Sequence, residues 1–127
     1  MTTSYRQAGV DIDAANASVA RIADMARATF GAGAARPIGH FGGTFHLAAG
    51  GDRLLVASAD GIGTKLKLAF ILGGEAHARV GADLVNHCVN DILTLGARPL
   101  FFLDYVAMGS LDRDALEGLV GGMADAC

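Results

Sequence analysis

The chain has 127 residues, of which 52% are hydrophobic and 18% charged, with a formal net charge of −3 at pH 7. This length suits one domain, and the hydrophobic content excludes a disordered chain. Without basic runs, the negative balance argues against nucleic-acid binding. No apolar stretch approaches the ~20 residues that span a bilayer, no secretory signal is visible, and two cysteines make no disulfide framework. We therefore expect a soluble, reduced, cytoplasmic protein with no membrane contact.

The N-terminal half predicts a helix followed by a hairpin, because apolar residues first recur at helical spacing and then give way to short strands between glycines. The expected elements are a helix that begins at an Asp11 or Asp13 cap, reaches Phe30 and ends at Gly31, a flexible glycine-rich loop at 31–43, and strands at 44–48 and 53–58 joined by a turn at 50–52.

The C-terminal half predicts three helices and a strand that is buried on both faces. The expected elements are a helix at 64–72 closed by two glycines, a helix at 78–95 ended by Gly96, the strand at 100–106, and a helix that starts at an Asp112 cap. The predicted fold class is therefore α/β, a mixed sheet with helices packed on it rather than a βαβ repeat. The last helix reaches Cys127 without a glycine, proline or polar tail, so we expect a fragment of a longer protein.

The first candidate site is the turn at 58–66, between a predicted strand and a predicted helix. Backbone N–H groups at such a place can point at a phosphate. The order Gly63-Thr64-Lys65 does not fit a P-loop, and Leu66 stands where a dinucleotide fingerprint needs a small residue. Asp60 and Lys65 around two glycines could form a cradle for Mg²⁺ and phosphate. The alternative is an ordinary Asp-Gly turn with a solvated lysine.

The second candidate site is the polar arc of the helix at 78–95. This arc has no cation between positions 82 and 97, although solvated helix faces usually carry lysine and arginine. Its members are Asp83, Asn86, His87, Asn90, Asp91 and Thr94. Their oxygen atoms suit a hard cation such as Mg²⁺; the alternative is a surface face that lacks lysine. His87 fits a boundary position better than a metal site, and Cys88 lies on the apolar arc.

Three weaker signals lie elsewhere. The loop at 40–45, with Gly42 and Gly43, could fold over a nucleotide or act as a hinge into a strand. Arg6, Asp11 and Asp13 precede the first helix and resemble a capped helix leader. Asp104 is unusual within an aromatic strand, since a buried carboxylate needs a partner, whereas an edge position would expose it.

Taken together, four segments resemble phosphoribosylformylglycinamidine cyclo-ligases, the aminoimidazole ribonucleotide (AIR) synthetases of purine biosynthesis. They follow in order along the whole chain: Tyr-Arg-Gln-Ala-Gly-Val-Asp-Ile-Asp-Ala at 5–14, Asp-Gly-Ile-Gly-Thr-Lys-Leu-Lys-Leu at 60–68, Cys-Val-Asn-Asp-Ile-Leu at 88–93 and Pro-Leu-Phe-Phe-Leu-Asp-Tyr at 99–105. The resemblance implies that residues 1–127 are the N-terminal, ATP-binding domain, with the second domain absent.

The resemblance also implies the reaction. ATP would phosphorylate the formyl amide oxygen of formylglycinamidine ribonucleotide, and the amidine nitrogen would then displace phosphate to give aminoimidazole ribonucleotide. ATP and Mg²⁺ are the implied cofactors. The implied assembly is a homodimer in which two copies complete the sheet, with nucleotide bound near the interface.

Particular residues take roles from this resemblance. Asp60 and Asp91 would hold Mg²⁺ on the triphosphate, and Asp91 and Lys65 would be the catalytic pair. The remaining nucleotide-binding residues would be Gly61, Gly63, Thr64, Asp83, Asn90, Gly42 and Gly43. Such positioning and charge compensation is most of what phosphoryl transfer asks of a protein.

Two features depart from the family pattern. Arg6 stands where the family has lysine, which differs in reach and geometry. The chain also ends before the family's Gly-Gly-Glu-Thr motif. Two alternatives remain: another ATP-dependent enzyme of the superfamily (selenophosphate synthetase, thiamine-monophosphate kinase or hydrogenase-maturation type), or a non-catalytic chain that binds Mg²⁺-ATP. A selenophosphate synthetase would carry a reactive cysteine near its start, and none precedes Cys88.

Overall fold

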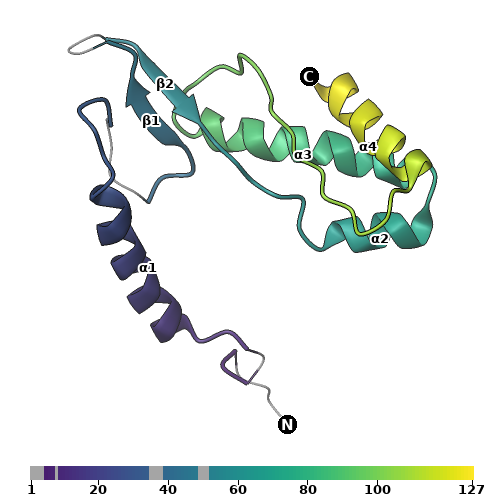
Figure 1. The fold of residues 1–127 in the computed structure, drawn as a ribbon, viewed down its shortest axis with the longest axis horizontal. Coiled ribbons are helices and arrows are strands. Elements are labelled where there is room, and N and C mark those ends of the chain that lie inside the picture. Colours follow the sequence, from purple (N-terminus) through teal and green to yellow (C-terminus); the bar gives the residue numbers. More distant parts are fainter. Residues whose placement is uncertain (1–4, 8, 35–38, 49–51) are drawn as a thin grey trace. The chain divides into compact units, whose positions relative to one another are not determined.

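The computed structural model describes residues 5–7, 9–34, 39–48 and 52–127 and divides the chain into two compact units, Met1–Leu55 and Val56–Cys127. The elements in chain order are α1 (Ile12–Arg27), β1 (Gly43–His46), β2 (Leu54–Ala57), α2 (Lys65–Leu72), α3 (Glu75–Leu93) and α4 (Arg113–Ala126) (Figure 1). Helices and a sheet of two described strands make up this part of the chain, so the predicted mixed α/β class is confirmed. Among the described helices, none is long and apolar enough to cross a membrane.

Helix α1 begins as predicted at Asp11, whose side chain accepts a hydrogen bond from the backbone N–H of Ala14 at 3.1 Å. This bond satisfies one of the free donors of the first turn. The helix ends at Arg27, four residues before Gly31, so its predicted C-terminal end is wrong. Ala28 takes the C-cap position, and the next residues close single turns, with Phe30 N–H donating to Arg27 O at 3.1 Å.

The hairpin is confirmed, with β1 and β2 paired as neighbours and Leu47 N–H donating to Arg53 O at 3.3 Å. Strand β1 starts one residue and ends two residues before its predicted bounds, and β2 is one residue shorter than predicted at each end. The first unit adds an antiparallel bridge between Ala34 and Phe45. Two glycines of the expected turn, Gly50 and Gly51, lie outside the described residues.

The second unit is built around the packing of α3 against α4, which lie side by side in Figure 1. Its buried apolar cluster comes from α2, α3 and α4 and consists of Ala69, Val80, Val85, Leu119 and Met123. Glycines allow the two backbones to approach closely. A Cβ on Gly122 would lie 2.5 Å from the carbonyl carbon of Ala78, and one on Gly81 would lie 3.0 Å from that of Leu119. Only glycine fits at these two positions without moving the helices apart.

The boundaries of α3 and α4 follow local backbone chemistry. Gly73 and Gly74 have φ of +67° and +53°, and their left-handed backbone reverses the chain so that α3 starts at Glu75, three residues before its predicted start. Helix α3 ends at Leu93, near the predicted Gly96, which also has positive φ. Helix α4 begins at the predicted cap, where Asp112 accepts from Ala115 N–H at 3.0 Å.

The strand predicted at 100–106 is wrong, because residues 97–107 contain neither helix nor strand. Its expected burial is wrong as well: the exposed fractions of Leu100, Leu103 and Tyr105 are 77%, 83% and 90%. Aromatic and branched residues favour a strand, but a strand also needs a hydrogen-bonded neighbour. Phe102 packs against the apolar cluster, whereas Asp104 is exposed. Of the two expectations for Asp104, a buried carboxylate with a partner or an exposed one, the second is therefore the one observed.

Candidate functional site

Three side-chain contacts join the segment after β2 to one face of α3. Going down α3 from its C-terminal end, they are Ser58 with Asp91, Asp60 with His87, and Lys65 with Asp83. The three helix residues are spaced by four, so they lie one turn apart along a single face. The candidate turn and the polar arc, found separately in the sequence, are therefore one site within the second unit.

Asp91 is held by Ser58. The Ser58 hydroxyl donates to Oδ2 of Asp91 at 2.6 Å, and the contact is partly buried. This length is short but within the usual range for an O–H···O hydrogen bond. A carboxylate has about four acceptor positions, so one hydrogen bond leaves acceptor capacity for a ligand.

Asp60 is oriented by its own turn. One of its oxygens, Oδ1, accepts the backbone N–H of Gly61 at 2.7 Å, while Oδ2 lies 3.9 Å from Nδ1 of His87. The Asp60 side chain remains 48% exposed. His87 stands four residues before Asp91, so Asp60 contacts α3 about one helical turn before Asp91.

Lys65 pairs with Asp83. Its Nζ lies 2.8 Å from Oδ2 of Asp83, and the two side chains are 40% and 47% exposed. A pair this exposed adds at most about 1 kcal/mol to stability. Lys65 is also the first residue of α2, at the end of the turn that contains Gly61 and Gly63. The ammonium group is thus accessible to a phosphate, which would compete with Asp83 for it.

The donor set fits Mg²⁺ in part. Within the described ranges, no three His, Cys, Asp or Glu side chains gather as a metal-binding group. Mg²⁺ is commonly bound by only one or two carboxylates, with substrate phosphates and water as its other ligands. Asp60 and Asp91 are both partly accessible carboxylates on this side of α3, and their role as the residues that hold Mg²⁺ stays a prediction.

The other predicted site residues take no part in the three contacts between the turn and α3. Asn90 precedes Asp91 on α3 and is exposed, and Thr64 is the N-cap of α2 without a side-chain capping bond. Gly63 has φ of +70°, a conformation that glycine adopts without strain. Gly42 and Gly43 belong to the first unit, at the start of β1. Their roles in nucleotide binding stay predictions.

Sequence reasoning gave no role to Ser58 and assigned His87 only a boundary position. His87 is partly exposed beside Asp60, in agreement with that assignment. A signal for Ser58 was present, because a hydroxyl directly after a strand stands at the same edge as the residues of the following turn. Which helix residue it meets depends on tertiary packing.

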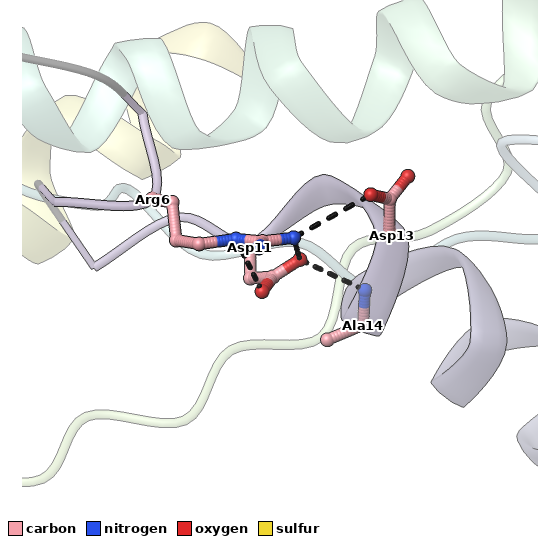
Figure 2. A network of polar contacts seen from close by, with 4 residues as sticks. All are labelled: Arg6, Asp11, Asp13 and Ala14. Atoms are coloured by element: carbon pink, nitrogen blue, oxygen red, sulfur yellow. Dashed lines mark hydrogen bonds and ion pairs between the residues drawn. The ribbon is translucent and has the colours of Figure 1, made fainter.

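Arg6 is engaged at the start of α1 (Figure 2). Its Nε lies 2.8 Å from Oδ2 of Asp11, and its Nη2 donates to Oδ1 of the same carboxylate at 3.2 Å. A longer contact of 3.5 Å reaches Asp13. Arg6 thus supports the carboxylate that caps α1, which is a local structural role for this residue.

Comparison with known proteins identifies the family. A family profile described as "AIR synthase related protein, N-terminal domain" matches residues 42–127. The chain belongs to this family. The match includes all three contacts between the turn and α3, so the candidate site lies inside the AIR synthase related domain.

Two curated relatives are similar over nearly the whole chain. A phosphoribosylformylglycinamidine cyclo-ligase of Sorangium cellulosum is 51% identical over 100% of the chain, and one of Oleidesulfovibrio alaskensis is 52% identical over 98%. These alignments cover 36% and 35% of the two relatives, so the chain spans about a third of their length. No solved structure matches the chain.

Proposed function

We propose that this chain is the Mg²⁺-ATP-binding part of a phosphoribosylformylglycinamidine cyclo-ligase that acts in the cytoplasm. The observation that carries the proposal is the set of three contacts that brings Asp60 and Lys65 onto the carboxylate face of α3. Identities of 51% and 52% to cyclo-ligases support the choice of this reaction within the family.

The proposed reaction has two steps. The formyl amide oxygen of formylglycinamidine ribonucleotide attacks the γ-phosphorus of ATP, and ADP leaves. The amidine nitrogen then attacks the activated carbon, loses a proton and expels phosphate, which closes the imidazole ring. Phosphorylation by ATP thereby converts the amide oxygen, a poor leaving group, into a phosphate ester that leaves readily.

The residues of the chain would act by positioning and charge compensation. Lys65 would leave Asp83 for the phosphates and offset the charge that develops as ADP departs. The amides of Gly61 and Gly63 would face the phosphate oxygens, with Thr64 and Asn90 as supporting polar groups. Mg²⁺, when held by Asp60 and Asp91, would supply further charge neutralisation on the triphosphate.

We also propose that two copies pair through the segment at 100–106. Four apolar or aromatic side chains there are strongly exposed: Leu100, Phe101, Leu103 and Tyr105, at 77%, 71%, 83% and 90%. So much exposed apolar surface in one short segment is typical of an interaction site. In the proposed homodimer this segment becomes a paired strand.

The test is calorimetric titration of the chain with ATP in the presence of Mg²⁺. We expect binding by the wild type, and weaker binding without a lower Tm in Asp91→Asn and Asp60→Asn. Asp125→Asn is the matched control, since it removes the same charge from an exposed position on α4. Unchanged affinity in both site variants would refute the metal role. Loss of folding instead would favour a structural turn.

A further inference from the structure

We infer that Ser58 is a positioning residue that presents the carboxylate of Asp91 to Mg²⁺-ATP. The inference rests on the proposed function, in which Asp91 holds the metal. Its basis is the 2.6 Å hydrogen bond from the Ser58 hydroxyl to Oδ2 of Asp91.

Both ends of this hydrogen bond are anchored in regular structure. Ser58 directly follows β2, which ends at Ala57, and is half-buried. Asp91 is in the last turn of α3 and is also half-buried. A bond between two anchored groups restricts the rotation of the aspartate side chain, so that Asp91 holds one orientation before a ligand arrives. Such preorganisation lowers the entropic cost of binding.

The chemical character of Ser58 distinguishes its contact with Asp91 from the contact of Lys65 with Asp83. Lys65 offsets the charge of Asp83, whereas Asp60 accepts the backbone N–H of Gly61. A serine hydroxyl is neutral, so it fixes the Asp91 carboxylate without cancelling its negative charge. Asp91 therefore keeps its negative charge for a cation, unlike Asp83, whose charge Lys65 offsets.

The hydroxyl also selects which oxygen is available. By donating to Oδ2, Ser58 directs the remaining acceptor capacity of Asp91, including Oδ1, away from itself. A threonine at this position would keep the hydroxyl, whereas an alanine would remove it with little change in volume. These two substitutions separate the hydrogen bond from the packing of the side chain.

The experiment measures the Kd of Mg²⁺-ATP and the Tm for Ser58→Ala, Ser58→Thr and the control Ser110→Ala, an exposed serine outside the site. We expect Ser58→Ala to raise the Kd by up to about tenfold, because the Asp91 side chain must then be ordered when the ligand binds. Ser58→Thr should restore most of the affinity, and the Tm should stay close to that of the wild type in all three.

A double-mutant cycle separates positioning from a general effect on the fold. In the Asp91→Asn background, Ser58→Ala should cause no further loss of affinity, because the group it positions no longer carries charge. An additive loss, or a fall in Tm that matches the loss of affinity, would overturn the inference.

The remaining outcomes distinguish the inference from the proposed function. If Asp91→Asn weakens binding but Ser58→Ala does not, the positioning role is refuted while the metal role of Asp91 stands. If the wild-type chain binds no Mg²⁺-ATP, the proposed function fails and the inference fails with it.

Discussion

Replacing Gly122 with alanine should destabilise the second unit, because its α-carbon lies against the backbone of α3. A Cβ there would be 2.5 Å from the carbonyl carbon and 2.7 Å from the Cα of Ala78. Carbon atoms in ordinary contact are about 3.5–4.0 Å apart, so the two helices would have to separate by roughly 1 Å. The apolar cluster, which includes Val80 and Met123, would then lose part of its packing.

The expected change is a balance of two effects. Overpacking of a core costs up to about 3 kcal/mol, while alanine gains about 1 kcal/mol over glycine inside a helix. The net loss in the free energy of unfolding is therefore about 2 kcal/mol. For a unit of this size, that loss lowers the Tm by roughly 8–16 °C.

The assay is thermal and urea denaturation followed by far-UV circular dichroism. Gly121→Ala is the matched control, since a Cβ at this position of the same helix would have nothing within 4 Å. It should raise the stability by up to about 1 kcal/mol through helix propensity alone. If Gly122→Ala proved as stable as Gly121→Ala, the close approach of α3 and α4 would be refuted.

Three further predictions concern single side chains. Lys65→Met should weaken binding of Mg²⁺-ATP about tenfold in calorimetry, as a charge-assisted contact with phosphate is lost, whereas Lys67→Met, an exposed neighbour on α2, should not. Asp11→Ala should destabilise α1 by about 1 kcal/mol through loss of its N-cap, seen as a smaller helical dichroism signal. Tyr105→Lys should shift sedimentation from dimer to monomer, since this side chain is 90% exposed in the segment proposed to pair.

Each of these predictions has a contrary result. Equal loss of affinity in both lysine variants would indicate a general charge effect rather than a contact of Lys65. An unchanged dichroism signal in Asp11→Ala would mean that the Asp11 cap does not stabilise α1. Sedimentation that does not differ between Tyr105→Lys and the wild type would exclude the 100–106 segment as the interface.

The helices could be predicted because their signals are local. Asp11 and Asp112 cap α1 and α4 as expected, since a side chain needs only the next three residues to form that hydrogen bond. The predicted start of α3 was three residues too late. The left-handed backbone at Gly73 and Gly74 lets the helix begin earlier, and the spacing of apolar residues does not indicate this conformation.

The prediction of a strand at 100–106 was wrong because the signal for a strand is not local. A strand forms only beside a hydrogen-bonded neighbour, which composition does not reveal. The role of Gly122 was equally hidden, because a glycine in a helix looks unfavourable until the second helix is placed against it. For the candidate site, the spacing of Asp83, His87 and Asp91 could be recognised from the sequence, whereas the identity of their partners required the fold.

The helical register of α3 links the side that packs on α4 to the side that carries the candidate site. One side is locked against α4 through Gly81, and the other carries Asp83, His87 and Asp91 at intervals of one turn. Adding or deleting one residue between Asp83 and Asp91 would rotate everything beyond it by about 100°. Asp91 would leave Ser58 while Asp83 kept Lys65, so the length of this stretch is under the same constraint as the identity of its acids.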